Sequence, residues 1–245
     1  NMNDKISVCM ATYNGMEFIS QQINSILKQL RSYDELIISD DGSTDGTIDI
    51  IRGFKDQRIK LLHHPQKLPP IKICKNNILV SDNFLNALNN VTGEYVFLSD
   101  QDDLWLATKV EKTLKVLKKI NCGLVMSTLE VIDSNGKIIQ KNGNLKKMSF
   151  WQGLIKSKYG GCTMAFDKIF LNKILPFPKY PVTHDAWIGL LAHYQNRIHL
   201  IDEPLIQYRR HYGNVTVNIV NPLWFKILYR IYYLLEVIKR TYLKK

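Results

Sequence analysis

The sequence predicts an α/β protein whose central sheet is mostly parallel and carries helices on both faces. Short apolar runs alternate with segments whose apolar residues recur at three- and four-residue intervals, which is the rhythm of βαβ units. Polar turns that contain glycine follow the first two apolar runs. With 245 residues and 45% hydrophobic content, the chain can bury a large core. One large domain with appendages is therefore expected.

Strands and helices alternate most clearly before residue 100. The expected order is strand 6–11, helix 17–30, strand 35–39, helix 47–54, strand 59–63, helix 81–90 and strand 95–99. Residues 65–74 are rich in proline and lysine and are expected to form a loop. Lys67, Lys72 and Lys75 either cover a site as a flap or lie in solvent.

The second half of the chain is less regular. Its expected elements are helix 106–120, strand 123–128, hairpin strands 129–132 and 137–140, and helices 150–156, 166–174 and 184–194. The hairpin is predicted from the turn sequence Asp133-Ser134-Asn135-Gly136. No convincing linker precedes residue 221.

Composition restricts the classes of function. Cys9, Cys74, Cys122 and Cys162 lie far apart, which is neither a zinc pattern nor a disulfide pattern. The formal charge of +11 permits an anionic membrane surface or a nucleic acid as partner, but no nucleic-acid module is recognisable, so no nucleic acid is expected. Without a signal peptide or a run of ~20 apolar residues, the protein is expected in the cytoplasm, with peripheral contact at the inner face of the cell membrane as an option.

The segment from Phe97 to Trp105 carries the strongest chemical signal. Its apolar run stops at Asp100, Asp102 and Asp103, three carboxylates within four positions. Aspartate is a poor strand former and neighbouring like charges repel, so folding alone gives no reason for the cluster. Carboxylates at a strand end suit Mg²⁺ or Mn²⁺, and these ions usually serve substrate phosphates. The alternative is a solvated acidic turn that caps the next helix.

Other aspartates are expected on the same side of the sheet. Asp40 and Asp41 follow strand 35–39, and Asp185 is expected to join them. In a parallel sheet, ligands bind beyond the carboxyl ends of the strands. Asp41 is expected to accept a hydrogen bond from a base or a ribose, as the acidic residue of dinucleotide folds does. The alternative for Asp40 and Asp41 is an Asx turn and a helix cap.

Three segments resemble the hallmark blocks of family 2 glycosyltransferases, in the family's order and spacing. They are Ile6-Ser7-Val8-Cys9-Met10-Ala11-Thr12-Tyr13-Asn14-Gly15, Leu36-Ile37-Ile38-Ser39-Asp40-Asp41-Gly42-Ser43-Thr44-Asp45-Gly46-Thr47 and Leu98-Ser99-Asp100-Gln101-Asp102-Asp103. Later segments resemble the bacterial branch that builds O-antigen and capsule polysaccharides, often with rhamnosyl donors. They are Gly160-Gly161-Cys162-Thr163-Met164-Ala165-Phe166, His184-Asp185-Ala186-Trp187 and Tyr208-Arg209-Arg210-His211. The resemblance covers roughly residues 5–216.

That resemblance implies a GT-A fold, which is Rossmann-like with an abutting acceptor-side half. It implies a metal-dependent, inverting transfer of one sugar from a nucleotide-diphosphate sugar, dTDP-rhamnose or a UDP-sugar, to a hydroxyl of a glycan or lipid-linked acceptor. Residues 1–216 would form the glycosyltransferase domain, with 1–105 as the nucleotide-sugar half and 106–216 as the acceptor half. Residues 63–82 depart from the family pattern, so donor preference stays open.

The resemblance also assigns roles to residues. The nucleotide would contact Ala11, Thr12, Tyr13, Asn14, Glu17, Asp41, Asn83 and Asp100. Mn²⁺ or Mg²⁺ would bind Asp102, Asp103 and His211, with Asp100 turned toward the ribose or the water shell of the metal. Asp185 matches the catalytic base, and the acceptor or the diphosphate would contact Thr163, Trp187, Arg209 and Arg210.

An inverting displacement needs one base and one electrophile, which Asp185 and the metal would supply. A carboxylate base works best with a raised pKa, so Asp185 is expected in a partly desolvated site beside Trp187. The alternatives are that Asp185 caps its helix, that Trp187 belongs to the core and that His211 is an ordinary histidine.

Residues 217–245 are expected to form a basic amphipathic C-terminal helix. Apolar residues recur at helical spacing through 222–243 and are interleaved with Lys226, Arg230, Lys239 and Arg240. Such a helix lies in the headgroup region of an anionic membrane, or else docks on the catalytic domain or on a second subunit. The oligomeric state is not predicted.

Two rival functions stay open. A sugar nucleotidyltransferase also uses an α/β sheet and metal carboxylates, but Thr12-Tyr13-Asn14-Gly15 is not the glycine-rich, basic phosphate loop that such an enzyme needs. A non-catalytic nucleotide- or glycan-binding module would use the carboxylates as structure only.

Overall fold

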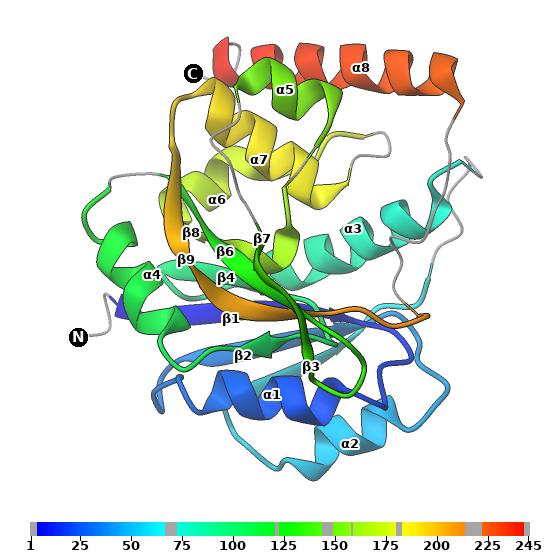
Figure 1. Ribbon diagram of the computed structural model, residues 1–245, viewed down its shortest axis with the longest axis vertical. Coiled ribbons are helices and arrows are strands. Elements are labelled where there is room, and N and C mark those ends of the chain that lie inside the picture. The colour runs from blue at the N-terminus through cyan, green and yellow to red at the C-terminus, as the bar shows by residue number, and fades with distance from the viewer. Residues whose placement is uncertain are drawn as a thin grey trace.

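The computed structural model describes residues 4–66, 73–120, 123–143, 149–157, 159–179, 183–213 and 222–242. The chain begins with the parallel part of its sheet, β1 (Ile6–Thr12), β2 (Glu35–Asp40), β3 (Ile59–His63) and β4 (Tyr95–Ser99). Strand β1 lies between β2 and β4, and β3 lies beyond β2. All four strands are parallel, so their carboxyl ends meet at one edge (Figure 1).

The second part of the sheet is mixed. Its strands are β5 (Leu104–Trp105), β6 (Leu124–Ile132), β7 (Ile138–Gly143), β8 (Met164–Asp167) and β9 (Ile198–Arg209). The order across the sheet is β3-β2-β1-β4-β8-β6-β9-β5, with β7 paired to β6. Strand β8 is antiparallel to both β4 and β6, whereas β9 is parallel to β6. Because β5 pairs with β9, the sheet is continuous across residue 105, where the two halves were expected to divide.

Helices cover both faces of the sheet, as predicted. On one face are α1 (Ile19–Leu27), α2 (Thr47–Gly53) and α4 (Lys109–Leu117), whose apolar residues share a core with β1, β2 and β4. On the other face are α3 (Lys75–Leu88), α6 (Lys168–Ile174) and α7 (His184–Tyr194). Helices α5 (Phe150–Ile155) and α8 (Leu223–Tyr242) pack outside α7 (Figure 1). Two apolar cores, one on each face, therefore fix the sheet.

Several predicted boundaries are wrong. Helix α3 begins at Lys75, not at residue 81, and the helix predicted over 166–174 begins as strand β8. Strand β6 is continuous where a strand and the first arm of a hairpin were predicted. Strands β5 and β9 were not predicted. The predictions for Lys67, Lys72 and Cys122 fall outside the described residues.

The C-terminal helix is present as α8, Leu223–Tyr242. Within the described ranges, no helix combines the length and the apolar character needed to cross a membrane.

Candidate active site

The loops after β1 and β2 are tied together at the carboxyl edge of the sheet. The side-chain oxygen of Asn14 accepts the N–H of Thr44 at 2.9 Å, and the N–H of Asn14 donates to Ser43 Oγ at 2.9 Å. The N–H of Gly15 donates to Thr47 Oγ1 at 2.8 Å. Asn14 holds a left-handed conformation with φ 47°, which asparagine tolerates better than most residues. These hydrogen bonds join the loop after β1 to the loop after β2. We call the two loops, residues 12–15 and 41–47, the rim.

Gln101 joins the loop after β4 to that rim. Its Oε1 accepts from Thr12 Oγ1 at 2.5 Å and from Tyr13 N at 2.9 Å, while its Nε2 donates to Tyr13 O at 3.1 Å. A Cβ on Gly15 would lie 2.4 Å from Gln101 Oε1, so this contact requires glycine. We did not single out Gln101 from the sequence, although its place between the motif aspartates was an available signal.

Asp40 and Asp41 have different surroundings. The Asp40 carboxylate accepts the N–H groups of Gly42 and Ser43 at 3.0 and 2.8 Å, which is the Asx turn that the sequence left open as the alternative. Asp41 lies against His64, with Asp41 Oδ1 and His64 Nδ1 2.9 Å apart. Burial raises the pKa of Asp41 and the His64 contact opposes that shift. Asp40 therefore shapes the turn, whereas Asp41 lies buried beside His64.

In the acidic cluster after β4, burial and neighbouring like charges destabilise the ionised carboxylates. Burial, together with the charges of Asp102 and Asp185, raises the pKa of Asp100 to about 7. Burial, with the charges of Asp100 and Asp102, also raises the pKa of Asp103 well above its ordinary value. The effect of Asp185 on Asp100 shows that the start of α7 and the end of β4 share one electrostatic environment.

The cluster fits a divalent cation. Asp103 is fully buried, and Asp103 Oδ1 accepts the Arg209 N–H at 3.1 Å. Asp103 Oδ2 is buried without a hydrogen-bond partner among the residues described. Ligand atoms of Asp100, Asp103 and Cys162 lie within 4.8 Å of one another. Carboxylates with raised pKa values and a buried oxygen that lacks a donor are what a bound cation would stabilise. The thiol of Cys162 beside this cluster was not predicted.

Asp102 and His211 are in contact, with Asp102 Oδ2 and His211 Nε2 2.8 Å apart. The His211 ring also packs on Phe18, at 4.8 Å between ring centroids. His211 Nδ1 accepts the Gly213 N–H at 3.1 Å, so in the neutral ring the proton lies on Nε2 and is shared with Asp102. The two predicted metal ligands from distant parts of the sequence thus lie side by side.

Arg209 does not present its guanidinium group to a diphosphate, and this part of the prediction is wrong. The side chain is buried and donates to Asp102 O at 2.9 Å, Ser134 O at 2.9 Å and Gln21 Oε1 at 3.0 Å. It also lies 4.6 Å from the ring centroid of Phe18. Arginine has a fixed fork of donors, and here carbonyl oxygens occupy it. Arg209 therefore holds the acidic loop in place.

The exposed neighbour Arg210 is still available for the diphosphate role. Its backbone N–H donates to Ile132 O at 2.8 Å, which fixes the backbone at the end of β9.

Trp187 is also misassigned, because it belongs to the core. Its side chain is fully buried, and its Nε1 donates to Ile174 O at 3.0 Å. Asp185 lies in the first turn of α7 and is partly exposed, and its carboxylate accepts the Ala186 N–H at 2.7 Å. The desolvated site that we expected beside Trp187 is therefore not formed by that indole.

His184 connects α7 to its neighbours just before Asp185. The His184 N–H donates to Ser81 Oγ at 2.9 Å, and the ring lies 4.2 Å from the Phe84 ring. A Cβ on Gly161 would lie 2.6 Å from His184 Nε2, so the ring fills the space above that glycine. These contacts with α3 and with the Gly161–Thr163 turn fix the position of Asp185.

The remaining predicted residues divide into buried and exposed groups. Asn83 donates to Thr12 O at 3.2 Å and Thr163 donates to Gly160 O at 2.8 Å, and both side chains are buried. Asn83 thus holds the backbone at the end of β1, and Thr163 holds the backbone of its own turn at Gly160. Ala11 is half-buried at the end of β1, whereas Tyr13 and Glu17 are exposed beside it.

The fold and this edge of the sheet define a GT-A glycosyltransferase. Residues 7–175 match the family Glycosyl transferase family 2, and the chain belongs to that family. Over 95% of this chain and 92% of the relative, it is 30% identical to UDP-Glc:alpha-D-GlcNAc-diphosphoundecaprenol beta-1,3-glucosyltransferase WfgD of Escherichia coli. Over 84% of this chain and 72% of the relative, it is 26% identical to dTDP-rhamnosyl transferase RfbG of Shigella flexneri. The chain spans 66% of the length of an uncharacterized Nostoc glycosyltransferase, with 29% identity.

Solved structures show the same fold. TarS of S. aureus in complex with UDP-GlcNAc superposes with a TM-score of 0.68 and 18% identity, over 98% of this chain and 73% of TarS. The mannosyltransferase PcManGT of Pyrobaculum calidifontis, in complex with GDP-Man and Mn²⁺, gives a TM-score of 0.59 and 17% identity, over 96% and 73%. The predicted GT-A fold is therefore confirmed.

Proposed function

We propose that this glycosyltransferase is metal-dependent and inverting, and that it moves one sugar from a nucleotide-diphosphate donor to a hydroxyl of a glycan or lipid-linked acceptor in bacterial surface polysaccharide synthesis. The observation that supports it best is the shared environment of Asp100, Asp102, Asp103 and Asp185 at the edge where parallel strands bind ligands. Four carboxylates placed together destabilise a fold, but they can hold the metal and supply the base that transfer from a nucleotide diphosphate needs.

In this proposal the rim residues bind the nucleotide. Asp41, buried beside His64, accepts a hydrogen bond from the base, and the loop fixed by Asn14 and Gln101 contacts the nucleotide through its backbone. The residues that would hold Mn²⁺ or Mg²⁺ are Asp102 and His211, which are in contact, and Asp103, whose carboxylate lies within 4.8 Å of that of Asp100. When bound, that cation neutralises the diphosphate and makes it a better leaving group.

Asp185 is the proposed general base. Its carboxylate takes the proton of the acceptor hydroxyl while that oxygen attacks the anomeric carbon, and the bond from this carbon to the diphosphate oxygen breaks on the opposite face. The electron pair leaves with the nucleoside diphosphate, and the configuration inverts. The fixed start of α7 gives this base a defined position.

The names of the relatives support a donor and acceptor class. WfgD is named for UDP-Glc and a diphosphoundecaprenol acceptor, and RfbG for a dTDP-rhamnosyl donor. TuaG of Bacillus subtilis, 26% identical, is named for teichuronic acid biosynthesis. A lipid-linked acceptor would place this enzyme at the inner face of the cell membrane. We propose a UDP-sugar or dTDP-rhamnose as donor, with Mn²⁺ or Mg²⁺.

Thermal unfolding with a panel of UDP-, GDP- and dTDP-sugars, with and without Mn²⁺, tests this proposal. A ligand that binds only the folded state at a hundredfold excess over its dissociation constant adds ~2.7 kcal/mol to the free energy of unfolding. We expect stabilisation by a UDP- or dTDP-sugar that depends on the metal. If no nucleotide sugar stabilises the protein in any metal condition, the proposal is wrong.

A further inference from the structure

Helix α8 is fixed to the domain through one of its faces. Tyr233 and Val237 are buried on this face, within the same core as α7. The Arg240 guanidinium donates to Lys173 O at 2.8 Å and to Leu175 O at 2.9 Å, at the end of α6. The sequence left open whether this helix docks on the domain or meets a membrane. The docked face accounts for only part of its apolar residues.

The opposite face of α8 is apolar and exposed. We call it the apolar stripe, and it consists of Leu223, Trp224, Ile227, Leu228, Ile231, Leu235, Ile238 and Tyr242. Exposure ranges from 38% at Ile238 to 71% at Leu223. Single exposed apolar residues are ordinary, but a continuous row along a helix marks a contact surface.

Helix α5 extends this surface. Trp151 and Ile155 lie one turn apart on α5 and are 60% and 61% exposed. Arg230 of α8 donates to the backbone oxygen of Ile155, so the two helices are adjacent. In Figure 1 they form the end of the molecule that lies farthest from α1 and α2. The exposed apolar residues of both helices thus lie at one end of the molecule.

We propose that α8 and α5 together form a docking surface for an anionic lipid bilayer. The basic residues of α8, Lys226, Arg230, Lys239 and Arg240, outnumber its one acidic residue, Glu236. The guanidinium groups of Arg230 and Arg240 donate to backbone oxygens of the domain but keep their charge, so the helix stays basic as a whole. A helix with an apolar face and basic residues lies in the plane of a membrane interface and prefers anionic lipids. Trp151, Trp224 and Tyr242 have amphipathic rings that suit the headgroup level.

A second copy of the chain is the other occupant that such a surface suggests, and charge argues against it. Two-fold pairing of α8 would bring together two helices that each carry an excess of basic residues, which repel. An anionic bilayer pairs with the same charges favourably. The inference concerns where the enzyme sits and does not depend on the donor or on the metal, so it is measured without either.

Tryptophan fluorescence with brominated lipids tests both helices in one measurement. Trp151 and Trp224 are exposed, whereas Trp105 and Trp187 are buried and serve as an internal reference. With vesicles of brominated phosphatidylcholine and phosphatidylglycerol, we expect quenching that Trp151→Phe and Trp224→Phe each reduce by about half and that the double variant abolishes. Quenching unaffected by Trp151→Phe would exclude α5 from the surface and overturn the two-helix proposal.

Vesicle co-sedimentation supplies the affinity. For the variant Leu228→Gln, Ile231→Gln and Leu235→Gln, we expect at least about tenfold weaker binding to vesicles with 30% phosphatidylglycerol, with an unchanged melting temperature. Ile139→Gln on β7, 56% exposed, is the matched control and should bind as the wild type does. Equal binding by the triple variant, no binding by the wild type, or a dimer in light scattering that the triple variant dissolves would each overturn the proposal.

Discussion

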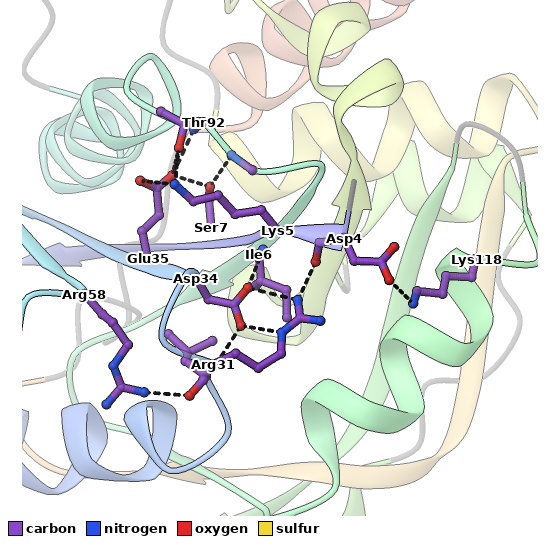
Figure 2. Close-up of polar contacts among 12 residues, drawn as sticks. Asp4, Lys5, Ile6, Ser7, Arg31, Asp34, Glu35, Arg58, Thr92 and Lys118 are labelled. Atoms are coloured by element: carbon purple, nitrogen blue, oxygen red, sulfur yellow. Dashed lines mark hydrogen bonds and ion pairs between the residues drawn. The ribbon is translucent and has the colours of Figure 1, made fainter. Parts of the chain in front are cut away.

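The two edges of the parallel strands use carboxylates in opposite ways. At the amino-terminal edge, shown in Figure 2, Asp34 accepts the Ile6 N–H at 2.9 Å and two guanidinium N–H groups of Arg31 at 2.9 and 3.0 Å. At the carboxyl edge, Asp103 Oδ2 is buried, and none of the described residues donates a hydrogen bond to it. Both aspartates are buried. Both carboxylate oxygens of Asp34 have partners within the protein, whereas Asp103 accepts the Arg209 N–H on Oδ1 and leaves Oδ2 as an atom that a cation could contact.

The pKa values follow the same division. Burial alone would raise the pKa of Glu35 at the amino-terminal edge, but hydrogen bonds from Ser7 and Thr92 and the charge of Lys5 outweigh burial and lower it. The Glu35 network is drawn in Figure 2. At the carboxyl edge, burial and like charges raise the pKa of Asp100 to about 7. Glu35 therefore stabilises the fold, whereas the raised pKa values of the clustered Asp100 and Asp103 are typical of a functional site.

The largest effect is expected from a substitution that removes the proposed base at the carboxyl edge and leaves the fold unchanged. Asp185→Asn should lower kcat by about 10²–10⁴-fold, because an amide cannot take the proton of the acceptor. The melting temperature should stay constant, since the amide oxygen can still accept the Ala186 N–H. A transfer assay measures kcat, with the nucleotide sugar that stabilises the protein in the thermal unfolding panel as donor.

Asp202→Asn provides the matched control, because Asp202 is exposed on β9. Its kcat should equal that of the wild type. Retention of more than a tenth of the activity by Asp185→Asn would remove Asp185 from the role of base.

The next largest effect is expected from a substitution at the amino-terminal edge, which should lower stability and leave catalysis unchanged. Asp34→Asn removes a buried charge that faces Arg31 and should cost about 3 kcal/mol of unfolding free energy. For a chain of this length, that lowers the melting temperature by about 6–12 °C. At 15 °C, kcat should be unchanged. Asp49→Asn, exposed on α2, is expected to cost under about 1 kcal/mol. A large loss of kcat in folded Asp34→Asn would contradict the division between the edges.

The free energy of unfolding should depend on pH in opposite ways at the two edges. From the ordinary pKa of 3.8 up to about 7, the folded protein binds more protons at Asp100 than the unfolded chain does. Without metal, the free energy of unfolding should therefore fall as pH rises through this window, by up to about 4 kcal/mol. Saturating Mn²⁺ should remove this fall because the cation stabilises the ionised form.

Glu35 contributes with the opposite sign. Its stabilisation is present above its ordinary pKa and is lost as pH falls through the lowered folded value. Thermal unfolding from pH 3 to pH 8, with and without Mn²⁺, separates the two edges. Identical profiles in both conditions would show that no cation reaches the carboxyl edge.

The smallest effect concerns the rim. Gln101→Ala removes the contacts to Thr12 and Tyr13 and frees the loop after β1. We expect the dissociation constant of the donor nucleotide to rise about fivefold, since each lost hydrogen bond contributes about 1 kcal/mol at most and water replaces part of it. Calorimetric titration with the nucleotide measures it. An unchanged dissociation constant would show that the loop is held by its contacts with β2 alone.

The sequence predicted the parallel part of the fold and the acidic cluster because both are local patterns. Strands such as β1 and β4 are apolar runs that end in polar turns, and the order of the blocks placed them at one edge. Strand β8 is only four residues long and runs directly into α6, so its apolar residues look like the start of a helix. Strand β9 contains Asp202, Glu203 and Pro204, which obscure its strand pattern.

The roles of Arg209 and Trp187 could not be read from their neighbours in sequence. An arginine beside a site binds either phosphate or backbone, and only the position of the Ser134 and Asp102 carbonyls decides between these. A tryptophan in a helix faces either a ligand or the core, and the Ile174 carbonyl settles it for Trp187. Both outcomes depend on contacts between residues far apart in the chain, which no local pattern encodes.

Calorimetric titration of Mn²⁺ into three proteins shows whether the carboxylates after β4 hold the metal. The wild type and Asp34→Asn should bind Mn²⁺ with the same affinity in the presence of UDP, because Asp34 lies at the amino-terminal edge. Asp102→Asn should bind at least about tenfold more weakly, since it removes a proposed ligand at the carboxyl edge. If Asp102→Asn binds Mn²⁺ as tightly as the wild type does, the carboxylates after β4 do not hold the metal and the account is contradicted.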